Sequence, residues 1–163
     1  FTLFVDNATQ DPDLPRRLLL TLKQFDSSFI VSPDSPKTAV NKKGYLVDLL
    51  TNKNMAGVTA GATPWKPECL AGQEWLTLGT PVKAVLIDFQ GWPVALRAPD
   101  PRYFALHKLW LSQRRGRPAK KAAKDKRQGL ALLDTIKNHM PHFPLGDDFT
   151  RSLPDQLREQ MKV

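Results

Sequence analysis

The stretch Ala39-Val40-Asn41-Lys42-Lys43-Gly44-Tyr45-Leu46-Val47-Asp48-Leu49-Leu50 decides the fold of this 163-residue chain. Its first half ends in Asn41 to Gly44, a polar segment with the composition of a tight turn. The apolar run from Tyr45 to Leu50 then predicts a strong strand. Shorter extended segments at 28–31 and 38–41 come before it, so the sequence predicts a β-meander around this turn.

Signals for helices lie on both sides of the meander. Leucines at helical spacing predict a helix over 14–25, and Asp100 followed by Pro101 predicts the start of another, ending near 113. Further helices are expected over 119–139 and from about 152. Between these regions, two β-rich runs over 81–97 predict a hairpin with a type I turn, and residues 51–79 are expected to be irregular.

The strands therefore come before most of the helices rather than alternating with them. This order is typical of the α+β class. We expect a mixed or antiparallel sheet followed by a C-terminal helical region. The predicted division is an α+β domain over 1–98, including the hairpin at 81–97, and a helical region over 99–163.

The composition excludes several classes of protein. Hydrophobic residues make up 41% of the chain and charged residues 25%, which is typical of a globular domain and not of a disordered chain. The longest apolar runs are too short to span a membrane. Cys69 is the single cysteine, so no intrachain disulfide can form, and no secretory signal is visible. A cytoplasmic protein without a membrane partner is expected.

The net charge of +8 is concentrated in one segment. Between Arg114 and Arg127 there are eight basic residues and one acid, Asp125. Lys120 and Lys124 are four residues apart on the predicted helix and share a face that could contact a triphosphate or a nucleic-acid backbone. Lys121 is expected to pair with Asp125 at the same spacing. A solvated basic helix start explains the pattern equally well.

Three other side chains are candidates for chemistry. Asp48 interrupts an apolar strand and points to the same side as its neighbours two residues away, so it must be paired, hydrogen-bonded, solvated or bound to a metal. An aspartate on the wet side of a sheet is the plain structural alternative. Lys108 lies at the edge of an apolar helical stripe, where most lysines only pack their methylenes. His107 beside it is expected to be a surface or packing residue.

Three stretches taken together resemble bacterial nucleotidyltransferase-like proteins of the polymerase-β-type superfamily. The first joins Phe25-Asp26-Ser27-Ser28-Phe29 to the stretch from Ala39 to Leu50. The second is Asp100-Pro101-Arg102-Tyr103-Phe104-Ala105-Leu106-His107-Lys108-Leu109, and the third is Lys121-Ala122-Ala123-Lys124-Asp125. The resemblance spans roughly residues 18–140 and implies a sheet of the nucleotidyltransferase type.

The resemblance also implies a reaction and its residues. It implies transfer of a nucleotidyl group from an NTP to an acceptor, RNA or a protein, by two-metal chemistry with Mg²⁺. Asp48 matches the third carboxylate of the family and would be both catalytic and a metal ligand. Lys108, Lys120 and Lys124 would face the nucleotide phosphates, and Asp125 would hold one of the lysines in place.

The chain departs from the family at one point. The family also has a Gly-Ser turn followed by an Asp-x-Asp strand, and that combination does not occur here. Since the chain begins at Phe1 without a methionine, we expect a truncated fragment that lacks this N-terminal segment and is inactive alone. The competing prediction is a non-catalytic module that binds nucleic acid through the basic 114–127 segment.

Overall fold

A computed structural model describes residues 2–5, 13–51 and 64–162 of the chain. It forms two compact units, residues 1–74 and 75–163. The mixed α+β class predicted from the sequence is confirmed, with a mixed sheet in the first unit and helices towards the C-terminus. The predicted domain division at residue 98 stays a prediction.

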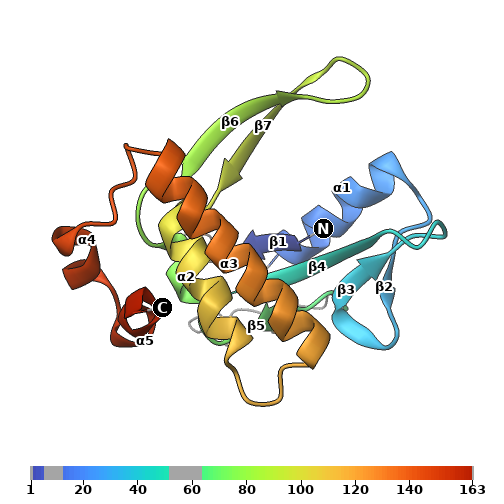
Figure 1. The fold of residues 1–163 in the computed structure, drawn as a ribbon. Helices are drawn as coiled ribbons and strands as arrows, with labels where there is room; N and C mark the ends of the chain where they lie inside the picture. The colour runs from blue at the N-terminus through green and yellow to red at the C-terminus, as the bar shows by residue number, and fades with distance from the viewer. Residues whose placement is uncertain (1, 6–12, 52–63, 163) are drawn as a thin grey trace. The chain divides into compact units, whose positions relative to one another are not determined.

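The first unit contains a mixed sheet, whose central strand is β4 (Figure 1). The strands run in the order β1 (Thr2–Val5), β4 (Leu46–Thr51), β3 (Ser35–Val40) and β2 (Ile30–Ser32), and β5 (Glu68–Cys69) also pairs with β4. β1 and β5 are parallel to β4, whereas β2, β3 and β4 form the predicted antiparallel meander. The sequence therefore predicted the meander correctly.

One face of this sheet forms the core of the first unit. Helix α1 (Leu14–Phe25) places its leucines against the side chains of Val47, Leu49 and the fully buried Trp65. The indole Nε1 of Trp65 donates a hydrogen bond to the carbonyl of Lys37 at 2.7 Å. Because side chains alternate along β4, residues 46, 48 and 50 lie on the opposite face.

The turn before β4 joins the two segments that make up the first family-like stretch, 25–29 and 39–50. The Asn41 side chain accepts hydrogen bonds from the backbone N–H groups of Lys43, at 3.1 Å, and Tyr45, at 2.8 Å. Its amide donates to the Asp26 carboxylate at 3.0 Å. Hydrogen bonds from Ser28, with further help from Asn41, lower the pKa of Asp26. The two segments therefore form one polar network that fixes the entry to β4.

The second unit contains a hairpin and a helical region. The hairpin consists of β6 (Val82–Ile87) and β7 (Pro93–Ala98), and the helices are α2 (Pro101–Ser112), α3 (Ala119–His139), α4 (Asp147–Ser152) and α5 (Asp155–Arg158). Short 3-10 turns cover Gln73–Thr77, which begins in the first unit, and Glu159–Lys162. The sequence predicted α2 and α3 within one residue but missed α4, which is only six residues long.

Buried Asp100 fixes the start of α2. Its carboxylate accepts hydrogen bonds from the backbone N–H of Arg102 at 3.0 Å and of Thr80 at 2.9 Å. The Arg102 side chain adds an ion pair at 2.7 Å. Burial opposes ionisation of Asp100, but these partners outweigh it and lower the pKa of the carboxyl group. The N-cap predicted at this position is confirmed.

Helices α2 and α3 pack closely because α3 has a glycine at the contact. A Cβ atom on Gly129 would lie 2.8 Å from Leu109 Cδ2 and 2.9 Å from the Ala105 carbonyl oxygen. The second of these neighbours is backbone of α2 and cannot move without shifting the helix. Gly129 therefore sets the distance between α2 and α3.

We expect Gly129→Ala to destabilise the second unit by about 1–3 kcal/mol, the usual cost of overpacking. This is the opposite of the gain of roughly 1 kcal/mol that alanine gives over glycine in an exposed helix. Urea unfolding followed by circular dichroism measures the change. The control is Gln128→Ala on the exposed side of α3. A more stable Gly129→Ala variant would show that the helices are not in close contact here.

Candidate functional site

Asp48 lies on the sheet face of β4 that points away from the core. It is half-buried, and Thr38 faces it across the β3–β4 ladder. The Thr38 hydroxyl donates to Asp48 Oδ1 at 2.7 Å, and the Ser35 hydroxyl lies 2.9 Å from Thr38 Oγ1. A hydroxyl has one proton, and Thr38 gives it to the carboxylate, so Ser35 donates to Thr38. Two hydroxyls in series thus fix one oxygen of Asp48.

An open apolar row lies next to Asp48 on the same face. Ile30, Val40 and Leu46 are cross-strand partners in β2, β3 and β4. Ile30 is 55% exposed and Leu46 is 52% exposed. A carboxylate with one fixed oxygen therefore borders an accessible apolar surface, which a planar apolar group such as a base could contact.

The described residues do not by themselves fit a two-metal centre at Asp48. Among residues 2–5, 13–51 and 64–162, no three or more His, Cys, Asp or Glu side chains are grouped so that they could hold a metal ion. Mg²⁺ is held by oxygen ligands in octahedral geometry, and two ions need several carboxylates. Asp48 offers one carboxylate, so we derive no metal-bound step from it.

Asp125 forms a buried charge cluster in the second unit. Its side chain is 0% exposed. Lys108 Nζ donates to Oδ1 at 3.1 Å, and Arg117 donates to Oδ2 through Nε at 2.9 Å and also through Nη2. Burial alone would raise the pKa of Asp125, but the bonds from Arg117 and Lys108 outweigh it and lower that pKa.

The expected pairing of Lys121 with Asp125 is therefore wrong. Asp125 lies one turn before Gly129, on the side of α3 that packs against α2. Its partners come from α2 and from the connection between the helices, where Gly116 turns the chain with φ 80°. The sequence did not predict the role of Arg117, because a partner eight residues away across a turn has no periodic signal.

Lys108 is held by this cluster rather than free in solvent. Its side chain is 18% exposed, and its ammonium lies 5.4 Å from the centre of the Phe104 ring in addition to its bond with Asp125. The structure thus brings two of the predicted site residues, Lys108 and Asp125, together from different helices. Their predicted contact with nucleotide phosphates stays a prediction.

The other two predicted lysines lie on the exposed side of α3, in its first two turns. Lys120, Lys124 and Arg127 follow one another at spacings of four and three, so they share one face. The N-cap is Pro118 with no side-chain hydrogen bond, and the first turn carries no acid. Free N–H groups and a positive dipole end there favour an anion, whereas lysines at this end do not stabilise the helix itself.

His107 is buried beside the Asp125 cluster. It is 2% exposed, and neither of its ring nitrogens has a hydrogen-bond partner. Its ring stacks on Trp110 at 5.9 Å and meets the edge of Trp75 at 6.2 Å. The pKa of His107 is lowered to about 4, mainly by burial and to a smaller extent by the charge of Lys108. The sequence left His107 as either a surface or a packing residue, and the structure shows that it packs.

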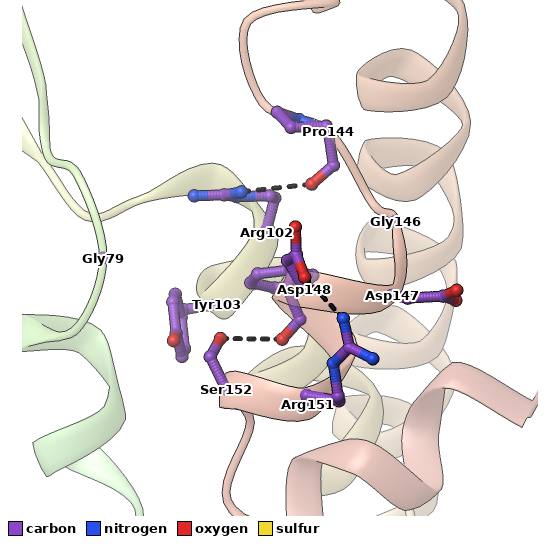
Figure 2. A pocket seen from close by; sticks show the side chains of 10 residues that line it. Gly79, Arg102, Tyr103, Pro144, Gly146, Asp147, Asp148, Arg151 and Ser152 are labelled. Carbon is purple, nitrogen blue, oxygen red and sulfur yellow. Dashed lines mark hydrogen bonds and ion pairs between the residues drawn. The ribbon is translucent and has the colours of Figure 1, made fainter.

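A hollow of about 580 Å³ lies between the start of α2 and α4 (Figure 2). Arg102 and Tyr103 line one side, and Arg102 donates to the Pro144 carbonyl at 3.1 Å. Asp148 and Arg151 on the other side pair with each other at 2.6 Å, and both are exposed. Because these charges pair within the chain, the hollow offers a ligand few free polar groups. No sequence signal predicted it.

The five predicted site residues divide between the two units. Asp48 belongs to residues 1–74, whereas Lys108, Lys120, Lys124 and Asp125 belong to residues 75–163. Within the described part of the chain, no helix is long and apolar enough to cross a membrane.

Comparison with known proteins gives the family. A family model described as Nucleotidyltransferase matches residues 5–154, which is most of the chain. Comparisons with curated proteins and with solved structures found no match. The family match agrees with the resemblance carried by the meander, by the start of α2 and by the start of α3. This chain belongs to the nucleotidyltransferase family that the model describes.

Proposed function

We propose that the protein transfers a nucleotidyl group from an NTP to an acceptor and binds the triphosphate at the start of α3. The observation that carries this proposal is the basic face of Lys120, Lys124 and Arg127 at an uncapped helix N-terminus. No described residue forms a recorded ion pair with these three side chains, since Asp125, the one acid nearby, is buried against Lys108 and Arg117.

The reaction follows from the chemistry of the family. An acceptor oxygen forms a bond to the α-phosphorus of the NTP, and the bond from that phosphorus to the bridging oxygen breaks. Pyrophosphate leaves with the electron pair of the broken bond, and the proton of the acceptor passes to the surrounding water. Cations on the phosphates lower the barrier because they stabilise the charge that develops on the leaving group. Lys120, Lys124 and Arg127 have this role in the proposal.

Asp48 is a separate part of the proposal and belongs to the first unit. Asp48 would contribute one carboxylate to a magnesium platform, and Thr38 and Ser35 would keep it oriented. Bound Mg²⁺ would supply charge neutralisation and an activated acceptor oxygen. The described residues offer one carboxylate there, so Asp48 alone would not hold two Mg²⁺ ions.

A second candidate function is binding of nucleic acid without catalysis. The observation that favours it is the number of basic side chains in the 114–127 segment that remain exposed. Seven are exposed, namely Arg114, Arg115, Lys120, Lys121, Lys124, Lys126 and Arg127. RNA is one of the two proposed acceptors, the other being a protein, so this surface would also serve an enzyme that modifies RNA.

The experiment is titration of the protein with each of the four Mg²⁺-NTPs by calorimetry. We expect Lys120→Ala combined with Lys124→Ala to weaken binding at least about tenfold, since each lost charge-assisted contact is worth about 1.5 kcal/mol or more. The matched control is Lys42→Ala combined with Lys43→Ala, which removes the same charge from an exposed turn of the first unit.

Salt distinguishes the two candidate functions. If the segment mainly neutralises the phosphates of RNA, affinity for a single-stranded RNA should fall by about 10³ or more between roughly 50 and 200 mM salt. NTP binding that survives the double substitution unchanged contradicts the proposed triphosphate site. RNA binding with this salt dependence and no NTP binding supports the second candidate instead.

A further inference from the structure

The β6–β7 hairpin exposes apolar side chains on both of its faces. The exposed fractions are 66% for Val85, 52% for Leu86, 67% for Ile87, 112% for Phe89, 67% for Trp92, 40% for Val94 and 44% for Leu96. Figure 1 shows the hairpin extending beyond α2 and α3 of the same unit, and its base residue Val82 packs on their core. From ordinary side-chain sizes, the exposed apolar area is roughly 800 Å², above the few hundred Å² that a monomer usually exposes.

The charges of the hairpin are arranged along its length. Lys83 and Arg97 are direct cross-strand partners at the base, on the same face as Val85 and Ile87. Like charges in this position repel each other, and no described residue forms a recorded ion pair with either side chain. The tip carries the opposite charge on Asp88, whose Oδ1 accepts from the backbone N–H groups of Gln90 and Trp92 at 2.8 Å each.

We propose that this hairpin is the interface of a homodimer, in which the face with Val85 and Ile87 packs antiparallel on the same face of a second copy. A two-fold axis near Val85 places the Asp88 tip of each copy over the basic base of the other. The surface is thus self-complementary in charge as well as apolar in its centre, as an isologous interface requires. Val85 and Ile87 give only part of the exposed area, so a weak and transient dimer is expected.

Other occupants fit these observations less well. A bilayer would leave the unpaired backbone groups at the edges of a two-stranded ribbon without hydrogen bonds, and it would receive Asp88 first. A nucleic acid would need basic side chains along the ribbon, whereas the only cations are the two at its base. A second copy would cover the apolar centre and pair the acidic tip of one hairpin with the basic base of the other.

Sedimentation equilibrium of the whole chain over a range of concentrations tests the dimer. We expect Val85→Glu to raise the dissociation constant at least about tenfold. Leu86→Glu on the opposite face is the matched control and should leave it nearly unchanged. A monomer at every concentration, or a dimer that only Leu86→Glu dissociates, overturns the proposal. Binding to anionic vesicles by a protein that stays monomeric also overturns it.

The orientation of the two copies has its own test. Residue 85 lies near the proposed two-fold axis. In a Cys69→Ser background, the Val85→Cys variant should therefore form a disulfide-linked dimer under oxidising conditions. Gln90→Cys at the tip should not link to itself, but it should link to Lys83→Cys when the two variants are mixed. Self-linking of Gln90→Cys without the mixed product indicates a parallel arrangement and contradicts the proposal.

The charge contribution is tested without disturbing the turn. Asp88→Asn keeps the oxygen that accepts the two backbone hydrogen bonds and removes the negative charge. We expect it to weaken the dimer about threefold to tenfold, and the effect should decrease as salt screens the charges. An equal or stronger dimer would show that Asp88 does not meet the basic base of the other copy.

Discussion

Asp125→Ala should destabilise the second unit by about 3–5 kcal/mol, the range for breaking a buried ion pair by removing one partner. Asp125 is fully buried, and the side chains of Lys108 and Arg117 are 18% and 28% exposed. Removing the carboxylate leaves both cations close together without an anion. It also releases the link between α2, α3 and the connection that contains Arg117.

Urea unfolding gives the total effect, and hydrogen exchange of the α2 and α3 amides shows whether it is confined to this unit. The control is Asp134→Ala, which removes an exposed acid whose recorded bond is with Asn138 at 3.0 Å. It should cost less than about 1 kcal/mol. Adding Lys108→Met to Asp125→Ala should recover part of the stability because it removes one of the stranded cations. A loss as small as that of the control would show that the cluster adds little stability.

Acid should destabilise the second unit through His107, starting well above the range of the carboxylates. Its pKa is about 4 in the folded protein against an ordinary value of 6.5. The unfolded state therefore binds more protons between these values, and stability falls as pH decreases from about 6.5 to 4. At 1.36 kcal/mol per pH unit, the full loss is about 3 kcal/mol. The lowered pKa values of Asp100 and Asp125 have the same sign but act below about pH 4.

His107→Leu isolates this contribution. Because neither ring nitrogen has a partner, replacing the ring by an apolar side chain leaves no hydrogen bond broken, and we expect stability at pH 7 to be nearly unchanged. The loss between pH 6.5 and 4 should largely disappear. His139→Leu at the exposed end of α3 is the control and should keep the loss. An equal pH dependence in wild type and His107→Leu would contradict the assignment.

The sequence determined the elements of the fold and the family. Helices over 14–25, 101–112 and 119–139, the meander and the hairpin all follow from apolar spacing and from turn residues. These are local signals, which act within a few residues along the chain. The same stretches that fix the turn before β4 and the start of α2 carry the family resemblance. The short helix α4 was missed because six residues give too little periodicity.

Local sequence signals predicted only some features of the candidate site. Lys120 and Lys124 could be placed on one exposed helix face from their spacing, and Asp48 on a sheet face from alternation. The partners of Asp125 could not be predicted from spacing. They depend on which side of α3 packs against α2, and Gly129 decides that contact. The sequence left His107 as a surface or a packing residue, and its burial with two unpartnered nitrogens depends on the surrounding Trp75 and Trp110.

The sequence by itself therefore determined the α+β class, the nucleotidyltransferase family and the location of the positive charge. Only the tertiary structure decided which charges are neutralised within the chain. Asp125 pairs with Lys108 and Arg117, so among the described residues no acid pairs with Lys120, Lys124 or Arg127. The physical reason is that a buried carboxylate loses its hydration, and only partners within hydrogen-bond distance offset that loss. These partners come from separate elements, so only the packing of the elements decides which they are.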